Sequence, residues 1–265
     1  MRRLLLALAV LVMTLGTGCM QIHIDTDIGP DGSGTATISY QVGREVADAL
    51  MKLEQAGGAS GMTGGTDEMP SLDELDREQV DAAARDSGVE VEEFERTDDA
   101  SGQSLRIVVA FDDVEELSAF LNSTTAEDAD EDMREELRIA RTDDGNFRLH
   151  TVSVPVPESE RGDAATDAEP GAGADDPPGG AEDMARMQDS MQYVGVLMGA
   201  MDQLDVRMTF TVPGEVLSSN AMEVDGRTSI WAINAANMMQ AQEGMEMEPE
   251  IVFASEGLSL EPSGR

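Results

Sequence analysis

Alternating apolar and polar residues, the pattern of half-buried β-strands, recur in short stretches along the chain. The first two stretches flank the Gly- and Pro-containing residues 29–34, which predicts a β-hairpin. Further hairpins are predicted over the turns at residues 98–102 and 143–146. The predicted strands are residues 21–25, 35–42, 89–96, 105–111, 137–141, 147–156, 204–212, 222–224, 229–233 and 251–254.

Apolar residues spaced three or four positions apart predict amphipathic helices over residues 44–55, 71–87 and 113–121. Ser71 and Glu74 have the spacing of a capping box that opens the second helix, and Gly88 marks its end. Glu116 stands in the capping position of the third helix. The expected fold class is therefore α+β, with antiparallel β-hairpins packed with a few amphipathic helices.

An abrupt change in composition separates the chain into two parts. Residues 157–182 contain only Pro, Gly, Ala, Ser, Thr, acidic residues and one Arg. Such a segment cannot bury enough apolar surface to offset its ordering entropy, so we predict a disordered acidic linker. Residues 19–156 and 183–265 are expected to be two parts of one extracytoplasmic domain, because the second alone would have a thin core. Two separate domains are the alternative.

After the predicted linker, a methionine-rich stripe follows helical spacing. We interpret it first as a core helix packed on the sheet. Methionine also suits surfaces that adapt to varied apolar ligands, so a ligand pocket or partner groove is the functional alternative. A helix lying on the membrane is disfavoured because its polar face is acidic. The stripe consists of Met184, Met187, Met191, Val194, Met198 and Met201.

The first 18 residues have the features of a secretory leader: Arg2 and Arg3, followed by a 12-residue apolar run over residues 4–15. At about 18 Å as a helix, that run is too short to span a bilayer. The leader ends Leu-Gly-Thr-Gly before Cys19, which resembles the lipobox of bacterial lipoproteins. This resemblance implies cleavage before Cys19 and a diacylglycerol on its thiol, so the predicted partner is a membrane of the envelope, inner or outer.

Acidic residues dominate the chain, with 54 Asp and Glu against 17 Lys and Arg and a net charge of −37. Phosphates of nucleic acids and acidic lipid headgroups would repel such a surface, so we exclude nucleic-acid binding and polybasic membrane docking. The even spread of acids along the chain is typical of a halophilic or high-GC source. Stability that rises with salt is the expected consequence.

The residue types needed for common catalytic and metal sites are scarce. The chain has a single cysteine, which excludes an intramolecular disulfide. Its two histidines, His23 and His150, and this one cysteine are too few ligands for a Cys/His zinc site. The sequence contains no nucleophile elbow that a histidine could serve as the catalytic base. The acidic turn at residues 25–32 lacks two required ligands of an EF-hand. We therefore expect no cofactor, no metal site and no enzymatic activity.

The C-terminal part of the chain carries Pro213-Gly214 after a strand, Val216, Asn220, the turn Asp225-Gly226, and Trp231 on the next strand. Together these residues resemble the signature of LppM-like bacterial lipoproteins. The turn at residues 31–35 is similar as well. The resemblance implies an envelope-facing α+β domain with lipid-related roles. Two departures are Val212 in place of an aromatic residue and a polar C-terminal segment. Trp231 is expected in the core, with its indole N–H hydrogen-bonded locally.

Together these observations predict a lipid-anchored envelope protein that binds a ligand or partner and catalyses nothing. The first hypothesis is a module for an apolar or lipid-like ligand. The second is a scaffold or interaction protein that docks a partner through its methionine-rich helix. A closed pocket would favour the first hypothesis, and an exposed apolar helix face would favour the second.

Overall fold

The computed structural model describes residues 20–55, 75–125, 133–155, 195–196, 199–200, 202–237 and 248–260. Several sequence predictions lie outside these residues: the leader 1–18, the lipidated Cys19, the linker 157–182 and the six side chains of the methionine-rich stripe. Residues 57–66, whose five glycines predict a flexible loop, lie outside them as well. Within the described part, no helix is both long enough and apolar enough to cross a bilayer.

The described residues form an α+β fold, as the hydrophobic pattern predicted. The helices are α2 (Arg44–Gln55), α4 (Arg77–Ser87) and α5 (Val114–Thr125). The strands are β1 (Met20–Ile28), β2 (Gly34–Gly43), β3 (Glu90–Asp99), β4 (Gly102–Phe111), β5 (Met133–Arg141), β6 (Phe147–Pro155), β7 (Leu204–Thr211), β8 (Val216–Ser219), β9 (Glu223–Asp225), β10 (Thr228–Asn234) and β11 (Glu250–Phe253). The strand β8 was not predicted, because its sequence Val-Leu-Ser-Ser does not alternate apolar with polar residues.

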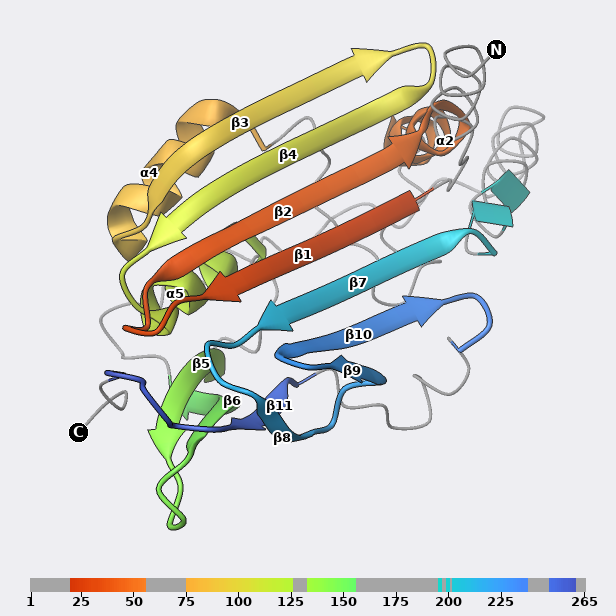
Figure 1. Cartoon of the computed structure of the whole chain (residues 1–265). Helices are drawn as coiled ribbons and strands as arrows, with labels where there is room; N and C mark the ends of the chain where they lie inside the picture. The colour runs from red at the N-terminus through yellow and green to blue at the C-terminus, as the bar shows by residue number, and fades with distance from the viewer. Residues whose placement is uncertain are drawn as a thin grey trace, which may run out of the picture.

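A seven-stranded sheet in the order β3-β4-β2-β1-β7-β10-β9 is the main structural unit (Figure 1). Its central strand, β1, pairs antiparallel with β2 and parallel with β7, so that Met20 lies between Val42 and Leu204. The parallel pair brings residues from before and after the predicted linker into one sheet. We call the end of this sheet at which β1 begins the proximal end, and the opposite end the distal end.

A four-stranded sheet in the order β5-β6-β11-β8 lies beyond the distal end of the large sheet (Figure 1). Its buried side chains include Leu149, Phe147 and Phe253, and the two aromatic rings stack with their centroids 5.8 Å apart. These side chains belong to the same hydrophobic cluster as those of the large sheet. A single main core therefore joins the two sheets.

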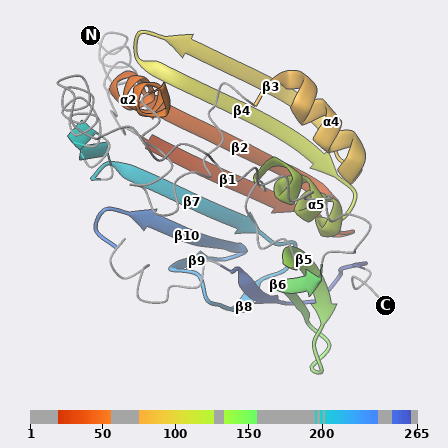
Figure 2. The ribbon, with the colours of Figure 1, turned by 180° about the vertical axis from the view of Figure 1, so that it is seen from behind.

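The helices α2, α4 and α5 cover one face of the large sheet, which we call the inner face (Figure 2). The alternation of strand residues directs apolar side chains to this face, including the fully buried Ala36, Val109 and Phe210. The intervening residues form the outer face, which is polar and faces the viewer in Figure 1. Burial of one face and hydration of the other is the usual state of an antiparallel sheet.

The ends of two helices show which cap predictions were right. Helix α4 begins at Arg77, and its capping box is formed by Asp76 and Gln79, so the predicted helix start at Ser71 was too early. Ser71 and Glu74 themselves lie outside the described residues. The Asp76 carboxylate accepts the Gln79 N–H at 2.8 Å. Gly88 ends the helix with φ of 91°, as predicted, since glycine tolerates the left-handed region. In α5, the side chain of Glu116 accepts the backbone N–H of Asp112 at 2.9 Å, which agrees with its predicted capping position.

Trp231 lies in the core as predicted, with 1% of its surface exposed. Its indole Nε1, however, has no hydrogen-bond partner among the described residues, so the predicted local hydrogen bond was wrong. The cause is its neighbourhood: its ring meets the edge of the Phe210 ring at an 88° interplanar angle, and both lie in the apolar core.

Candidate functional site

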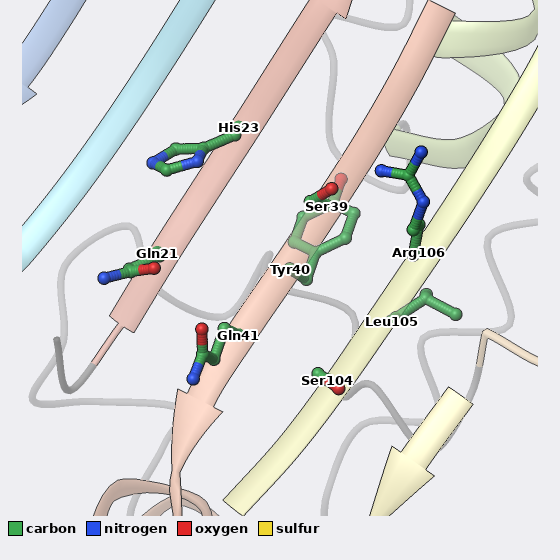
Figure 3. A pocket seen from close by; sticks show the side chains of 8 residues that line it. All are labelled: Gln21, His23, Ser39, Tyr40, Gln41, Ser104, Leu105 and Arg106. Atoms are coloured by element: carbon green, nitrogen blue, oxygen red, sulfur yellow. The ribbon is translucent and has the colours of Figure 1, made fainter. Parts of the chain in front are cut away.

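A shallow polar hollow of about 200 Å³ lies on the outer face of the large sheet, across β1, β2 and β4. Its polar lining comes from residues that alternate outward along these three strands (Figure 3). They are Gln21, His23, Ser39, Gln41, Ser104 and Arg106.

Within this hollow, His23 lies close to a charged side chain, that of Asp205. Its Nε2 lies 3.2 Å from Oδ2 of Asp205 on β7, and both side chains are about one-third exposed. The parallel register sets this contact, because Asp205 lies beside Gln21, two residues before His23. Residues 182 positions apart thus meet across neighbouring strands.

The sheet register also places Ser39 directly opposite His23. Serine, histidine and aspartate therefore follow one another across three strands, the residue types of a hydrolase triad. In Figure 3, however, the His23 ring points away from Ser39 and toward β7. A triad needs the histidine to accept the serine proton directly, so this row does not form one.

Another charge of the outer face, Arg106, belongs to an exposed ion pair. Arg106 Nε lies 3.3 Å from Oε1 of Glu93, with both side chains more than 40% exposed. Exposed pairs of this kind contribute about 0 to 1 kcal/mol to stability. Among the described residues, no group of three or more His, Cys, Asp or Glu is placed to hold a metal ion. The outer hollow is thus a solvated polar surface.

A second open hollow of about 280 Å³ lies near the edge of the same sheet, beside β9 and β10. Its lining combines Arg207 and Glu223 with the half-exposed Met222, which is 51% exposed. Neither this hollow nor the first is a closed apolar pocket. Neither of these two hollows is therefore the closed pocket that would favour the ligand-binding hypothesis.

The inner face differs sharply between its two ends. At the distal end of β1, Thr26 and Ile28 are each 2% exposed. Toward the proximal end, the apolar residues that alternate with them on the same face are half-buried, and the same gradient occurs along β7 and β10. The apolar surface therefore continues beyond the part of the core that is closed to solvent.

Five half-buried apolar side chains form this proximal surface, which we call the inner patch. Strand pairing makes the set contiguous: Met20 lies beside Leu204, Ile22 beside Val206, and Val206 beside Ile233. The five belong neither to the main core cluster nor to the smaller one. The members are Met20, Ile22, Leu204, Val206 and Ile233.

The inner patch lies in the sheet between two buried clusters. On one side is the main core, whose half-buried neighbours include Ile24 and Met208. On the other is a small cluster in which Val42 packs with Val46 of α2 and with Ala200. Next to the patch, Tyr40 lies opposite Ile22, and burial raises the pKa of its phenol.

The predicted site residues are not part of this geometry. Cys19 lies outside the described residues, as do all six side chains of the methionine-rich stripe. Among the described helical residues 195–196 and 199–200, Ala200 is buried and Val196 is half-buried. Sequence reasoning missed the inner patch, although its signal was present. Apart from Thr26, the alternating inner-face residues of the strands at 20–28 and 204–211 are all apolar.

No protein-family model and no curated protein matches the chain. Among solved structures, it is similar to the NMR structure of the folded domain of the Mycobacterium tuberculosis LppM protein. The two share 12% sequence identity over 89% of this chain and 90% of that one, with a TM-score of 0.40. At this identity and TM-score the likeness carries no argument about function, so the LppM-like interpretation of the sequence stays a prediction.

Proposed function

We propose that the chain is an exported, lipid-anchored protein of the bacterial cell envelope that binds an apolar or lipid-like ligand on the inner patch and catalyses no reaction. The leader and Cys19 support the anchor, and the exposed part of the inner patch supports the ligand. The observation that carries the ligand proposal is the gradient of burial along β1, β7 and β10, which leaves contiguous apolar side chains partly accessible.

Contiguous apolar surface of this kind marks interaction sites in soluble domains. Completing the burial of a half-buried Val, Leu, Ile or Met side chain is worth about 1 kcal/mol. Five such side chains give a ligand several kilocalories of favourable transfer energy before the entropic costs of binding. Polar groups able to fix a headgroup are not among the five, so the proposed ligand is recognised by its hydrocarbon part.

Two structural features support a binding role over an enzymatic one. The Ser39, His23 and Asp205 row lacks the serine–histidine contact that nucleophilic catalysis requires. The two hollows described above are both open, so neither would exclude water from a reacting group. Both features favour a module that holds a molecule without transforming it.

Native mass spectrometry of a soluble form, residues 20–265, tests the proposal. We expect a co-purified species of lipid-like mass that is lost on denaturation. The test variant is Val206→Thr, which keeps the β-branched shape of the inner-patch side chain but replaces one of its methyl groups with a hydroxyl. The matched control is Val108→Thr, the same change at a half-buried valine of the outer face.

A bound fraction that falls in Val206→Thr but not in Val108→Thr would support the inner patch as the ligand site. Equal bound fractions in the two variants would exclude it. A wild-type protein that carries no bound species would contradict ligand binding. A dimer in that spectrum would favour the second function, a protein that docks a partner.

A further inference from the structure

The anchor and the inner patch lie at the same end of the molecule. Met20 directly follows Cys19 and is already the first residue of β1. Consecutive Cα atoms are about 3.8 Å apart, so no spacer separates the acylated residue from the sheet. Since β1 is the central strand of the large sheet, a lipid on Cys19 would hold the middle of the proximal end against the bilayer.

Strand direction decides which other residues lie near the anchor. Strand β7 runs parallel to β1 and begins at Leu204, beside Met20. Strand β10 runs antiparallel to β7 and ends at Asn234, beside Asp205. With a rise of about 3.3 Å per residue, Ile22, Val206 and Ile233 all lie within about 7 to 10 Å of the proximal end. The inner patch is thus the apolar surface next to the membrane.

The two faces of the sheet differ in what they offer to a bilayer at this level. The outer face carries Gln21, His23, Asp205 and the exposed Arg207. Charged and hydrogen-bonding groups lose their hydration in hydrocarbon, which costs free energy. Apolar side chains gain free energy when they move from water into hydrocarbon. The inner face at the same level carries Ile22 and Val206. Contact with acyl chains therefore favours the inner face.

We propose that the inner patch opens onto the bilayer that holds the protein's own anchor, and that its ligand is a diacyl lipid of that bilayer. The lipid enters with its acyl chains first and does not cross bulk water. This inference rests on the lipid anchor and apolar-ligand binding proposed above, and it adds the source and class of the ligand.

Charge at the proximal end selects the headgroup. The β3–β4 turn carries Asp98 and Asp99, and Asp202 precedes β7. Arg44 pairs with Asp98, and Arg207 and Lys52 are further cations of this end, but Asp99, Asp202, Asp205, Glu45 and Asp48 leave its described part with an acidic excess. An anionic headgroup beside these carboxylates would be repelled. The favoured ligand is therefore a lipid with a neutral or zwitterionic headgroup.

Fluorescence quenching by membrane lipids tests which face meets the bilayer. The full-length lipidated protein is reconstituted in phosphatidylcholine vesicles that contain a lipid with a nitroxide on its acyl chain. Cys19 is the only cysteine of the chain, and lipidation blocks its thiol. A single introduced cysteine can therefore be labelled with an environment-sensitive fluorophore.

The adjacent residues Val206 and Arg207 form a matched pair, because they lie at one height on β7 but on opposite faces. Quenching should be severalfold stronger for Val206→Cys than for Arg207→Cys. A label at Asp144→Cys, in the distal β5–β6 turn, should show almost none. The pair Ile233→Cys and Ala232→Cys on β10 repeats the comparison. It can replace the first pair if one of those variants does not fold.

The outcomes separate this inference from the proposed function. Intact mass shows first whether the protein carries a diacylglyceryl group; a protein without it overturns both the anchor and this inference. A lipidated protein with equal quenching at both members of each pair overturns the inference and leaves the anchor standing. In phosphatidylglycerol vesicles, quenching at Val206→Cys should fall, and an unchanged value would overturn the headgroup preference.

Discussion

The indole ring of Trp231 meets the ring of Phe210 edge to face, with ring centroids 6.0 Å apart. The two residues come from the neighbouring strands β10 and β7, and each is 1% exposed. The pair therefore ties two C-terminal strands of the large sheet together in the main core. Such pairs contribute about 0.5 to 1.5 kcal/mol beyond the burial of their area.

Truncation of this pair should destabilise the domain strongly. Trp231→Ala removes a fully buried aromatic ring, and we expect it to lower the free energy of unfolding by about 3 to 5 kcal/mol. Trp231→Phe should lower it by less than about 1.5 kcal/mol, because it also removes an indole N–H without a partner. Urea unfolding followed by circular dichroism measures both. Equal losses in the two variants would contradict the aromatic contact with Phe210 as a source of stability.

Gly34, at the start of β2, has no room for a side chain. A Cβ atom there would lie 2.1 Å from the backbone oxygen of Asp27 and 2.6 Å from the ring of Phe111. Gly34→Ala should therefore lower the free energy of unfolding by at least about 1 to 3 kcal/mol, since strand backbone must move. Gly199→Ala is the control: it lies in a helix with no atom within 4 Å of the added Cβ, so stability should be unchanged or slightly higher. A harmless Gly34→Ala would contradict the close β1–β2 turn.

Stability should depend on pH through Glu136, whose carboxylate accepts a hydrogen bond from Arg138 at 2.8 Å and one from Arg134 at 2.9 Å. Burial by itself would raise the pKa of Glu136, but the two guanidinium groups outweigh burial and hold that pKa below its ordinary value of 4.5. A carboxyl group with a lowered folded-state pKa stabilises the fold above its unfolded-state pKa. This stabilisation is lost as the pH falls through the folded-state value.

Glu136→Gln should accordingly lower the free energy of unfolding by about 1 to 2 kcal/mol at neutral pH and by much less in acid. Glu135→Gln, at the exposed neighbouring position, removes the same formal charge and serves as the control. Unfolding curves at a series of pH values compare the two variants. A loss for Glu136→Gln that stays constant down to acid pH would exclude the ion pairs as its cause.

Salt should stabilise the domain, because its net charge of −37 produces strong self-repulsion in dilute buffer. Ions at high concentration shorten the screening length from about 10 Å at 0.1 M to about 3 Å at 1 M. The melting temperature of the soluble form should therefore rise steeply as KCl is added. Sucrose at matched viscosity is a control without ionic screening. A melting temperature that does not change with KCl would contradict the explanation of the acidity as an adaptation to salt.

The local elements were predictable from sequence because their causes are local. The alternation of apolar residues set nearly every strand, and turn chemistry at residues 29–34 and 143–146 set the hairpins between them. Gly88 ended a helix for a reason confined to its own backbone, its positive φ. The start of the same helix was harder to predict. Ser71 and Asp76 each begin a possible capping box, five residues apart, and the sequence alone does not show which one the helix uses.

The sequence by itself determined the α+β class, the hairpins, the polar and apolar faces of each strand and the predicted anchor at Cys19. Only the tertiary structure decided that β7 lies parallel to β1, because that pairing joins residues such as His23 and Asp205 across 182 positions. The inner patch follows from that pairing. Periodicity shows which side chains share a face, but their burial depends on how far the helices and the second sheet extend over it. That is a property of packing between distant segments, and it left the proximal ends of β1, β7 and β10 partly accessible.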